Sequence, residues 1–170
     1  MKKFLFILLF IVSLYEPSLA KKDALELKSS KINEHFIFES YIGNNDGLES
    51  LIGYYYDYFL SERVFIALGT SWAIVGNHGG YGTALIGLGY AHPLQDNLFL
   101  DLKVFTGAGG HILIDAGGGG ALAWQLGMNY KIIDPLILEV RYGGLQFPSG
   151  GYEVNTLGIG VSYLYGLLFL

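Results

Sequence analysis

The chain has 170 residues, of which 52% are hydrophobic and only 15% are charged, and its formal net charge is −5. About a quarter of the residues are charged in a typical soluble domain, so a mean hydropathy of +0.41 indicates that something other than water contacts much of the surface. The absence of cysteine excludes disulfides, thiolate metal sites and a lipid-modified N-terminal cysteine. No cluster of lysine and arginine suggests a nucleic-acid partner.

The first 20 residues have the features of a secretory signal. Lys2 and Lys3 precede an apolar stretch at residues 4–14, and Ser18 and Ala20 place small side chains at the positions required for cleavage. The apolar stretch is shorter than the ~20 residues with which a helix spans a bilayer. We therefore expect cleavage after Ala20 and export through the secretory pathway.

The rest of the chain divides into a polar segment and one long patterned region. Residues 21–34 are polar and charged, which predicts a short periplasmic lead-in. Across residues 35–170 no window has the length and apolarity of a transmembrane helix, and apolar residues alternate with others at a period close to two. Because this period is typical of β-strands, we expect residues 35–170 to form a single β-barrel domain.

The alternation predicts eight strands, at residues 36–42, 48–60, 64–74, 84–91, 98–105, 121–130, 136–143 and 156–165. One face of these predicted strands is strongly apolar and carries no charge, whereas the charged residues all fall on the other face. A membrane barrel turns apolar residues to lipid and keeps polar groups inside. The pattern therefore predicts an all-β fold, a closed antiparallel up-and-down transmembrane barrel of about eight strands. A soluble barrel of the lipocalin kind, with an apolar interior, is the alternative.

The predicted connections differ in length between the two ends of the barrel. Three are tight and carry turn residues: Ser61–Arg63, Pro93–Asn97 and Asp134–Pro135. The other four are generally longer and lie at 44–47, 76–82, 108–120 and 145–151. Short turns face the periplasm and longer loops face outward in outer-membrane barrels, so we expect both termini in the periplasm.

Aromatic residues on the apolar face are expected at the two membrane interfaces, where amphipathic rings are favoured. Near the periplasmic interface we expect Phe36, Tyr58, Tyr90, Tyr130 and Tyr163, and nearer the outside Tyr54, Trp72, Trp124 and Tyr142. These nine residues form the predicted aromatic girdle.

A polar set on the second face is expected inside the barrel near mid-height. Its members are Glu39, Asp57, Asp101, Lys103, Gln125, Asn129, Glu139 and Arg141. An unpaired buried charge is costly and an eight-stranded barrel is just wide enough for its side chains, so we expect these charges to pair with each other. The alternative is a narrow, gated polar path, in which four acids against two bases favour cations.

Together these features resemble the superfamily of small outer-membrane barrels that includes the OmpA, OmpX and OmpW types. The resemblance covers residues 35–170 and includes the aromatic end at Tyr163, Tyr165 and Phe169, which is similar to the C-terminal signal read by the barrel-assembly machinery. That signal usually ends on Phe or Trp, whereas this chain ends on Leu170. The resemblance implies location in the bacterial outer membrane, with lipid, lipopolysaccharide and the barrel-assembly machinery as partners.

The last two predicted strands also resemble the lipid A deacylase (PagL) family, but the catalytic motif of that family is absent. The motif places a His and a Ser two residues apart, because the His takes the Ser proton and frees the Ser to attack an ester. The comparable stretch here, residues 141–145, reads Arg-Tyr-Gly-Gly-Leu. We therefore predict no catalytic residue.

The remaining candidates for chemistry also point to no bound group. His35 is expected at the start of the first strand and His92 beside a turn, while His78 and His111, with Asp115, fall in glycine-rich loops. A metal or acid–base cluster of the loop residues is the less favoured interpretation. We predict no metal and no cofactor.

Three functional hypotheses follow, in order of preference. The first is a non-catalytic barrel that supports the envelope or contacts partners through its loops. The second is a narrow channel for small solutes or hydrophobic compounds, and the third is a lipid A-modifying enzyme. The sequence leaves the oligomeric state open.

Overall fold

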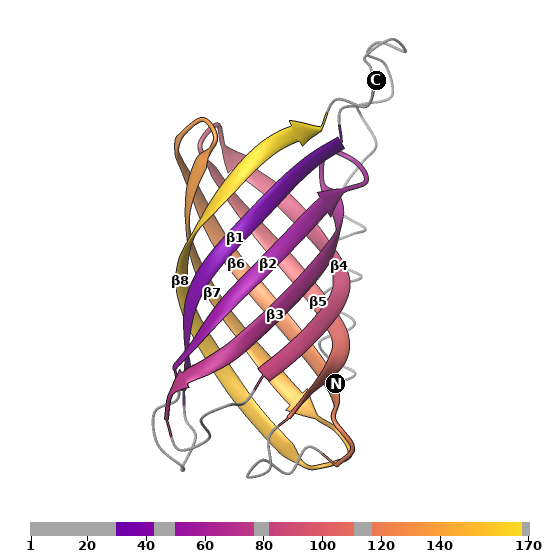
Figure 1. Ribbon diagram of the computed structural model, residues 1–170. Helices are drawn as coiled ribbons and strands as arrows, with labels where there is room; N and C mark the ends of the chain where they lie inside the picture. The colour runs from indigo at the N-terminus through magenta and orange to yellow at the C-terminus, as the bar shows by residue number, and fades with distance from the viewer. Residues whose placement is uncertain (1–29, 43–49, 77–81, 111–116, 168–170) are drawn as a thin grey trace.

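The computed structural model describes residues 30–42, 50–76, 82–110 and 117–167. Within these ranges the chain forms eight strands and no helix, and the strands close into one antiparallel barrel in which β8 pairs with β1 (Figure 1). The strands are β1 (Ser30–Ile42), β2 (Ser50–Phe59), β3 (Val64–Val75), β4 (Gly82–Gln95), β5 (Leu98–Gly110), β6 (Gly120–Ile133), β7 (Leu136–Phe147) and β8 (Tyr152–Leu167). The predicted all-β, up-and-down barrel of eight strands is confirmed.

The strands are tilted and staggered, as closure of a barrel requires. The paired residues of successive strands run from Ile32 through Tyr58, Ile66, Leu88, Val104, Trp124, Gly144 and Asn155 to Ile42. One circuit therefore returns to β1 ten residues beyond Ile32, where it began. With ten to 16 residues each, the strands are long enough to cross a bilayer at such a tilt.

The two ends of the barrel are distinguished by their connections. The turn end has the short connections at 60–63, 96–97 and 134–135, and the loop end has those at 43–49, 76–81, 111–119 and 148–151. The predicted signal peptide and the apolar tip of the loop at 111–116 lie outside the described residues. Among the residues that are described, no helix is long and apolar enough to span a membrane.

The outer surface is largely apolar along the strands, and polar or charged side chains join it where strands extend beyond their predicted limits, as at Glu34 on β1, Gln146 on β7 and Glu153 on β8. β1 begins at Ser30 rather than at residue 35, because residues 30–34 pair with β8 in spite of their polar composition. The extension puts Glu34 on the outer face, in line with Phe36 and Phe38, which are both exposed. The prediction of an outer face without charge is therefore wrong at Glu34.

Ser50 is a second difference from the predicted faces. Alternation within residues 48–60 gives Ser50 the lipid-facing parity of Ile52 and Tyr54, but Ser50 is buried at the first position of β2. The pairing of β2 with β3 shifts between Ser50 and Leu51, and such a bulge re-aims a side chain. The Ser50 hydroxyl lies 3.3 Å from the hydroxyl of Ser40 on β1.

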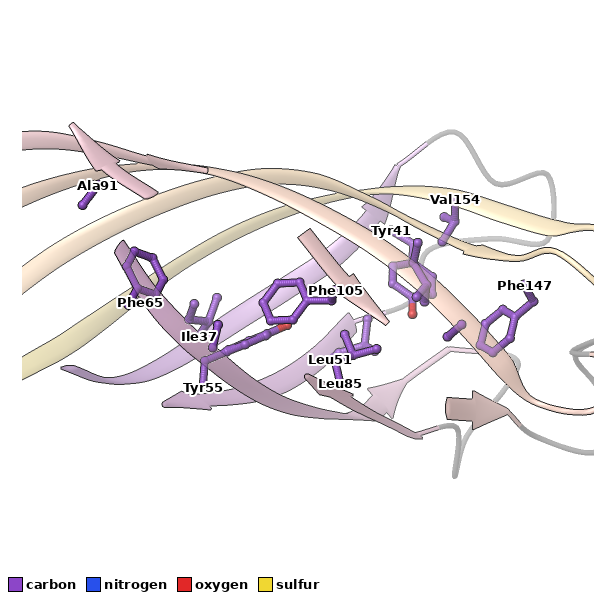
Figure 2. Close-up of a cluster of buried hydrophobic side chains, with 13 residues drawn as sticks. Ile37, Tyr41, Leu51, Tyr55, Phe65, Leu85, Ala91, Phe105, Phe147 and Val154 are labelled. Carbon is purple, nitrogen blue, oxygen red and sulfur yellow. The ribbon is translucent and has the colours of Figure 1, made fainter. Parts of the chain in front are cut away.

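Apolar side chains fill much of the interior and form one cluster that extends along the lumen to the loop end. Figure 2 shows Phe65 and Ala91 on one side of this cluster and Tyr41, Phe147 and Val154 on the other. Tyr41 and Phe147 come from the last residues of β1 and β7, so this part of the cluster lies at the loop end. Because these side chains pack against one another, the loop end of the lumen is closed by apolar contacts.

Two glycines make room for the largest ring in the middle of the lumen. Tyr55 is 2% exposed, and its ring lies against Gly53 on its own strand and Gly69 on β3. A Cβ atom at Gly53 would lie 2.6 Å from Cε2 of Tyr55, and one at Gly69 would overlap the same ring. Glycine is therefore required at both positions by space.

We predict that Gly69→Ala lowers the free energy of unfolding by about 1–3 kcal/mol, the usual cost of overpacking a core. The Tyr55 ring cannot move aside freely, because its hydroxyl is hydrogen-bonded to both Glu39 and Gln125. Urea unfolding of refolded protein in lipid vesicles, followed by the gel shift between folded and heated protein, measures the change. The matched control is Gly120→Ala, where a Cβ meets nothing within 4 Å. Equal stability of the two variants would contradict the packing argument.

Candidate functional site

The eight polar residues singled out in the sequence all lie inside the barrel and are buried. Glu39 is on β1, Asp57 on β2, Asp101 and Lys103 on β5, Gln125 and Asn129 on β6, and Glu139 and Arg141 on β7. Lys103 and Glu139 are 0% exposed and Arg141 is 2% exposed. The strands therefore bring charged side chains from opposite walls of the barrel into its interior.

His35 connects two of the carboxylates. Its Nε2 lies 2.7 Å from Oδ2 of Asp57, and its Nδ1 lies 2.9 Å from Oε2 of Glu139. The ring projects inward from β1. Asp57 is on the neighbouring strand β2, and Glu139 is on β7, which is separated from β1 by β8. The imidazole thus links β2 to β7 across the seam where the first and last strands meet.

Arg141 competes for the same imidazole nitrogen. Its Nη2 lies 2.8 Å from Nδ1 of His35 and donates to Oε2 of Glu139 at 3.0 Å. A neutral ring that donates from Nε2 to Asp57 accepts from Arg141 at Nδ1, whereas a protonated ring donates to both carboxylates. In both proton arrangements each ring nitrogen makes one hydrogen bond, so neither nitrogen is left without a partner.

A chain of hydrogen bonds continues from Arg141 toward the loop end. Nη1 of Arg141 donates to Oε1 of Gln125 at 3.2 Å, and Nε2 of Gln125 donates to the Tyr55 hydroxyl at 3.0 Å. The Tyr55 hydroxyl donates in turn to Oε1 of Glu39 at 2.9 Å. The Arg141 guanidinium also lies 4.8 Å from the centroid of the Tyr55 ring, a distance that allows cation–π attraction. Tyr55 is therefore held by both its ring and its hydroxyl.

Lys103 and Asp101 add contacts from β5. Nζ of Lys103 donates to Oδ2 of Asp57 at 2.6 Å and lies 5.3 Å from the centroid of the Phe65 ring. Nδ2 of Asn129 donates to Oδ2 of Asp101 at 2.8 Å. With His35 on the same Asp57 oxygen, one carboxylate connects β1, β2 and β5.

Two residues that take part in these interior contacts, His35 and Tyr55, were not among the eight predicted from the sequence. His35 was expected at the start of a strand, but β1 begins five positions earlier, so His35 lies well inside the barrel. The signal was present in the alternation, because His35 shares the inward parity of Ile37 and Glu39. We use the name interior network for His35, Tyr55 and the eight predicted polar residues.

The space left around the network is small. A cavity of about 20 Å³ is lined by residues that include Glu39, Tyr55 and Gln125, and it is close to the smallest volume that holds one water molecule. The interior network and the apolar cluster thus occupy the cross-section of the lumen at this level. Buried charges with several partners rigidify a structure, and the space beside Glu39, Tyr55 and Gln125 is too small for a molecule larger than water.

The nine predicted girdle residues lie on the outer surface, and strand pairing shows which of them lie near the ends of the barrel. Tyr90, Tyr130 and Tyr163 pair with Val64, Leu98 and Leu136, the first residues of β3, β5 and β7 at the turn end. Tyr58 pairs with Ile32 near the start of β1. Trp72 pairs with Gly82, the first residue of β4 at the loop end.

Phe36 and Tyr54 cannot both lie in the bands expected of them. Phe36 pairs directly with Tyr54, which was assigned to the opposite interface. Hydrogen-bonded partners in a sheet lie about 5 Å apart, so these two residues cannot be at opposite sides of a membrane. Trp124 and Tyr142 make an edge-to-face contact with 5.6 Å between ring centroids. The sequence could not separate these levels, because they depend on the stagger between strands.

The described residues contain no group of three or more His, Asp and Glu side chains arranged to hold a metal ion. His78, His111 and Asp115, the loop residues of the alternative metal hypothesis, lie outside the described residues. Within the stretch compared with lipid A deacylases, Arg141 belongs to the interior network and Tyr142 faces outward. Neither residue is positioned as a nucleophile with an adjacent base.

Comparisons with known proteins support the fold. No protein-family model matches the sequence, and no curated protein matches it. A de novo designed transmembrane β-barrel superposes with a TM-score of 0.63 at 16% identity, covering 83% of this chain and 100% of that one. The N-terminal β-barrel domain of Pseudomonas aeruginosa OprF gives a TM-score of 0.59 at 14% identity, covering 81% and 98%.

Ail, the attachment invasion locus protein of Yersinia pestis, gives a TM-score of 0.54 at 12% identity, covering 83% of this chain and 100% of that chain. It is an outer membrane protein that has also been solved in a phospholipid bilayer nanodisc. At these identities the likeness concerns the fold alone. The chain thus has the fold of a small eight-stranded transmembrane β-barrel.

We predict that Asp57→Ala lowers the free energy of unfolding by about 3–5 kcal/mol, because it leaves Lys103 buried without its carboxylate. The double variant Asp57→Ala, Lys103→Met recovers part of the loss, since no unpaired charge then remains at this contact. Urea titration in lipid vesicles, followed by the fluorescence of Trp72 and Trp124, measures both.

The control for this prediction is Asp134→Ala. Asp134 is 84% exposed and its carboxylate lies 3.0 Å from Nζ of Lys131, so its loss should change stability little. Equal stability of Asp57→Ala and Asp134→Ala, or a double variant no more stable than Asp57→Ala, would show that the contact between Asp57 and Lys103 does not stabilise the barrel.

Proposed function

We propose that this protein is a non-catalytic, non-conducting outer-membrane barrel that acts through its ends and its outer surface, in an envelope-supporting or surface-contact role. The observation that carries the proposal is the filled lumen. The interior network joins β1, β2, β5, β6 and β7 by hydrogen bonds of 2.6 to 3.2 Å. Between this network and the loop end, the lumen is filled by the apolar cluster that includes Phe147 and Val154.

The filled lumen disfavours the channel hypothesis on energetic grounds. A conducting path through the network requires Arg141 or Lys103 to leave a buried carboxylate, and breaking a buried ion pair is strongly unfavourable. It also requires apolar side chains such as Leu51 and Phe147, both 0% exposed, to separate. The proposal therefore assigns the contacts of the protein to its loops and its lipid-facing surface.

We predict that the refolded wild-type protein gives no unitary conductance steps in planar lipid bilayers under conditions in which a general porin conducts. Folding is verified beforehand by heat-modifiable gel migration. Defined steps in the wild type that change in size with Arg141→Ala would overturn the proposal and establish the narrow channel instead. Arg141 is the informative position because its guanidinium lies within hydrogen-bonding distance of three members of the network and against the ring of a fourth, Tyr55.

The proposal includes the route of the protein to the membrane and the partners there. Residues 1–20 serve as a cleaved secretory signal, the barrel-assembly machinery inserts the chain, and the turn end faces the periplasm. The features that support this are the basic and apolar start of the chain and the aromatic positions at its end, Tyr163, Tyr165 and Phe169. Lipopolysaccharide and phospholipid are the lipids in contact with the apolar outer face.

We predict that protein extracted from an outer-membrane fraction begins at Lys21. Intact-mass and N-terminal peptide measurements detect this directly, because cleavage after Ala20 removes residues 1–20. The variant Ala20→Leu places a large side chain at the cleavage position and should cause the uncleaved precursor to accumulate. An outer-membrane protein that retains Met1 would refute the cleaved-signal proposal.

A further inference from the structure

Glu34 is a carboxylate on the apolar outer face of the barrel, flanked by aromatic residues. It pairs with Tyr56 on β2 and with Tyr163 on β8, so a tyrosine stands beside it on each neighbouring strand. Charged residues on the lipid-facing side of a barrel are unfavourable to a degree that depends on depth. Its place beside Tyr163 puts Glu34 at the level of the turn-end aromatic band.

A tyrosine hydroxyl solvates this carboxylate without neutralising it. The Tyr165 hydroxyl donates to Oε1 of Glu34 at 2.6 Å. An ionised carboxylate offers about four acceptor positions, so this hydrogen bond leaves other acceptor positions of Glu34 unoccupied. No ion pair joins Glu34 to another side chain in the part of the chain that the structure describes. The negative charge is therefore available to a cation from outside.

An apolar groove adjoins the Glu34 site on the outer surface of β2, β3 and β4. It has a volume of about 660 Å³, and Tyr54 and Tyr56 form one of its sides. Thr70 and Ala84 pair with each other and leave a hollow beside the larger pair Leu68 and Ile86.

The surface of the groove is almost entirely hydrocarbon. The Thr70 hydroxyl donates to the backbone carbonyl of Thr83 at 2.8 Å and so does not need a polar partner in the groove.

The groove begins at the level of the carboxylate and extends from there along the barrel axis toward the loop end. Tyr56 pairs with Glu34, whereas Tyr54, two residues nearer the loop end, pairs with Thr70 on β3. Thr70 pairs in turn with Ala84 on β4. A molecule that lies in the groove therefore extends from the turn-end aromatic band toward the middle of the apolar surface.

We propose that Glu34 and this groove form a binding site for one membrane phospholipid that carries a primary ammonium head group, of the phosphatidylethanolamine type. The ammonium binds the free acceptor positions of Glu34 and the faces of the neighbouring tyrosines, since aromatic faces attract cations. An acyl chain of the same lipid lies in the groove and packs against its apolar side chains. Charge complementarity selects the ammonium, because a carboxylate repels a purely anionic head group.

Native mass spectrometry of the refolded full chain, released from detergent, tests the site. The probes are phosphatidylethanolamine, its N-acetylated derivative, which lacks the positive charge, and phosphatidylglycerol. The wild type should retain phosphatidylethanolamine over both other lipids by about tenfold, as expected for a hydrogen bond between charged groups. Glu34→Gln keeps an acceptor for Tyr165 but should remove this preference.

Two further variants complete the design. Glu62→Gln changes an exposed carboxylate in a turn at the same end and should leave the preference intact. Ala84→Phe fills the groove and should lower retention of all three lipids while the preference among them persists. Equal retention of the three lipids by the wild type, or an unchanged preference in Glu34→Gln, would overturn the proposal. Neither result bears on conductance, so the proposed function is tested separately.

Discussion

The width of the lumen is the constraint on which the rest of this structure depends. Eight strands with a stagger of ten residues enclose an interior just wide enough for side chains. Every group that faces inward must therefore fit against others, and every charge must find a partner there. The glycines beside Tyr55, the shared oxygen of Asp57 and the small cavity near Gln125 are three consequences of this single limit.

The division of the interior into a polar part and an apolar part follows from the same limit. Water cannot solvate the polar groups of a filled lumen, so hydrogen bonds between side chains take its place, as in the run from Arg141 through Gln125 and Tyr55 to Glu39. Toward the loop end apolar residues such as Leu51 and Phe147 need no such partners. The lumen is thus filled by two kinds of contact: hydrogen bonds, which are directional, and apolar packing, which is not.

Much of the fold could be predicted from the sequence, because alternation at a period of two depends on local chemistry alone. It identified the eight strands and the inward face that carries Lys103, Glu139 and Arg141. The limits of β1 were not predictable, since residues 30–34 are polar and join the sheet only through pairing with other strands.

Stagger between strands was equally invisible in the sequence, which is why Phe36 and Tyr54 were assigned to different levels. To predict the contacts of His35 from the sequence, one would have to know where β1 begins and that ring closure brings Glu139 close to it.

The position of His35 beside the closing seam has a consequence for the order of assembly. Its partners Glu139 and Arg141 lie on β7, and β8 stands between them and β1. These bonds require the last strand to have joined the first, because only then do β1 and β7 face each other across a completed wall. Until that moment Arg141 lacks its imidazole partner, and the sheet has open edges at β1 and β8, which hydrocarbon does not tolerate. The hydrogen bonds between the buried histidine and β7 are therefore a property of the completed ring and not of the open sheet.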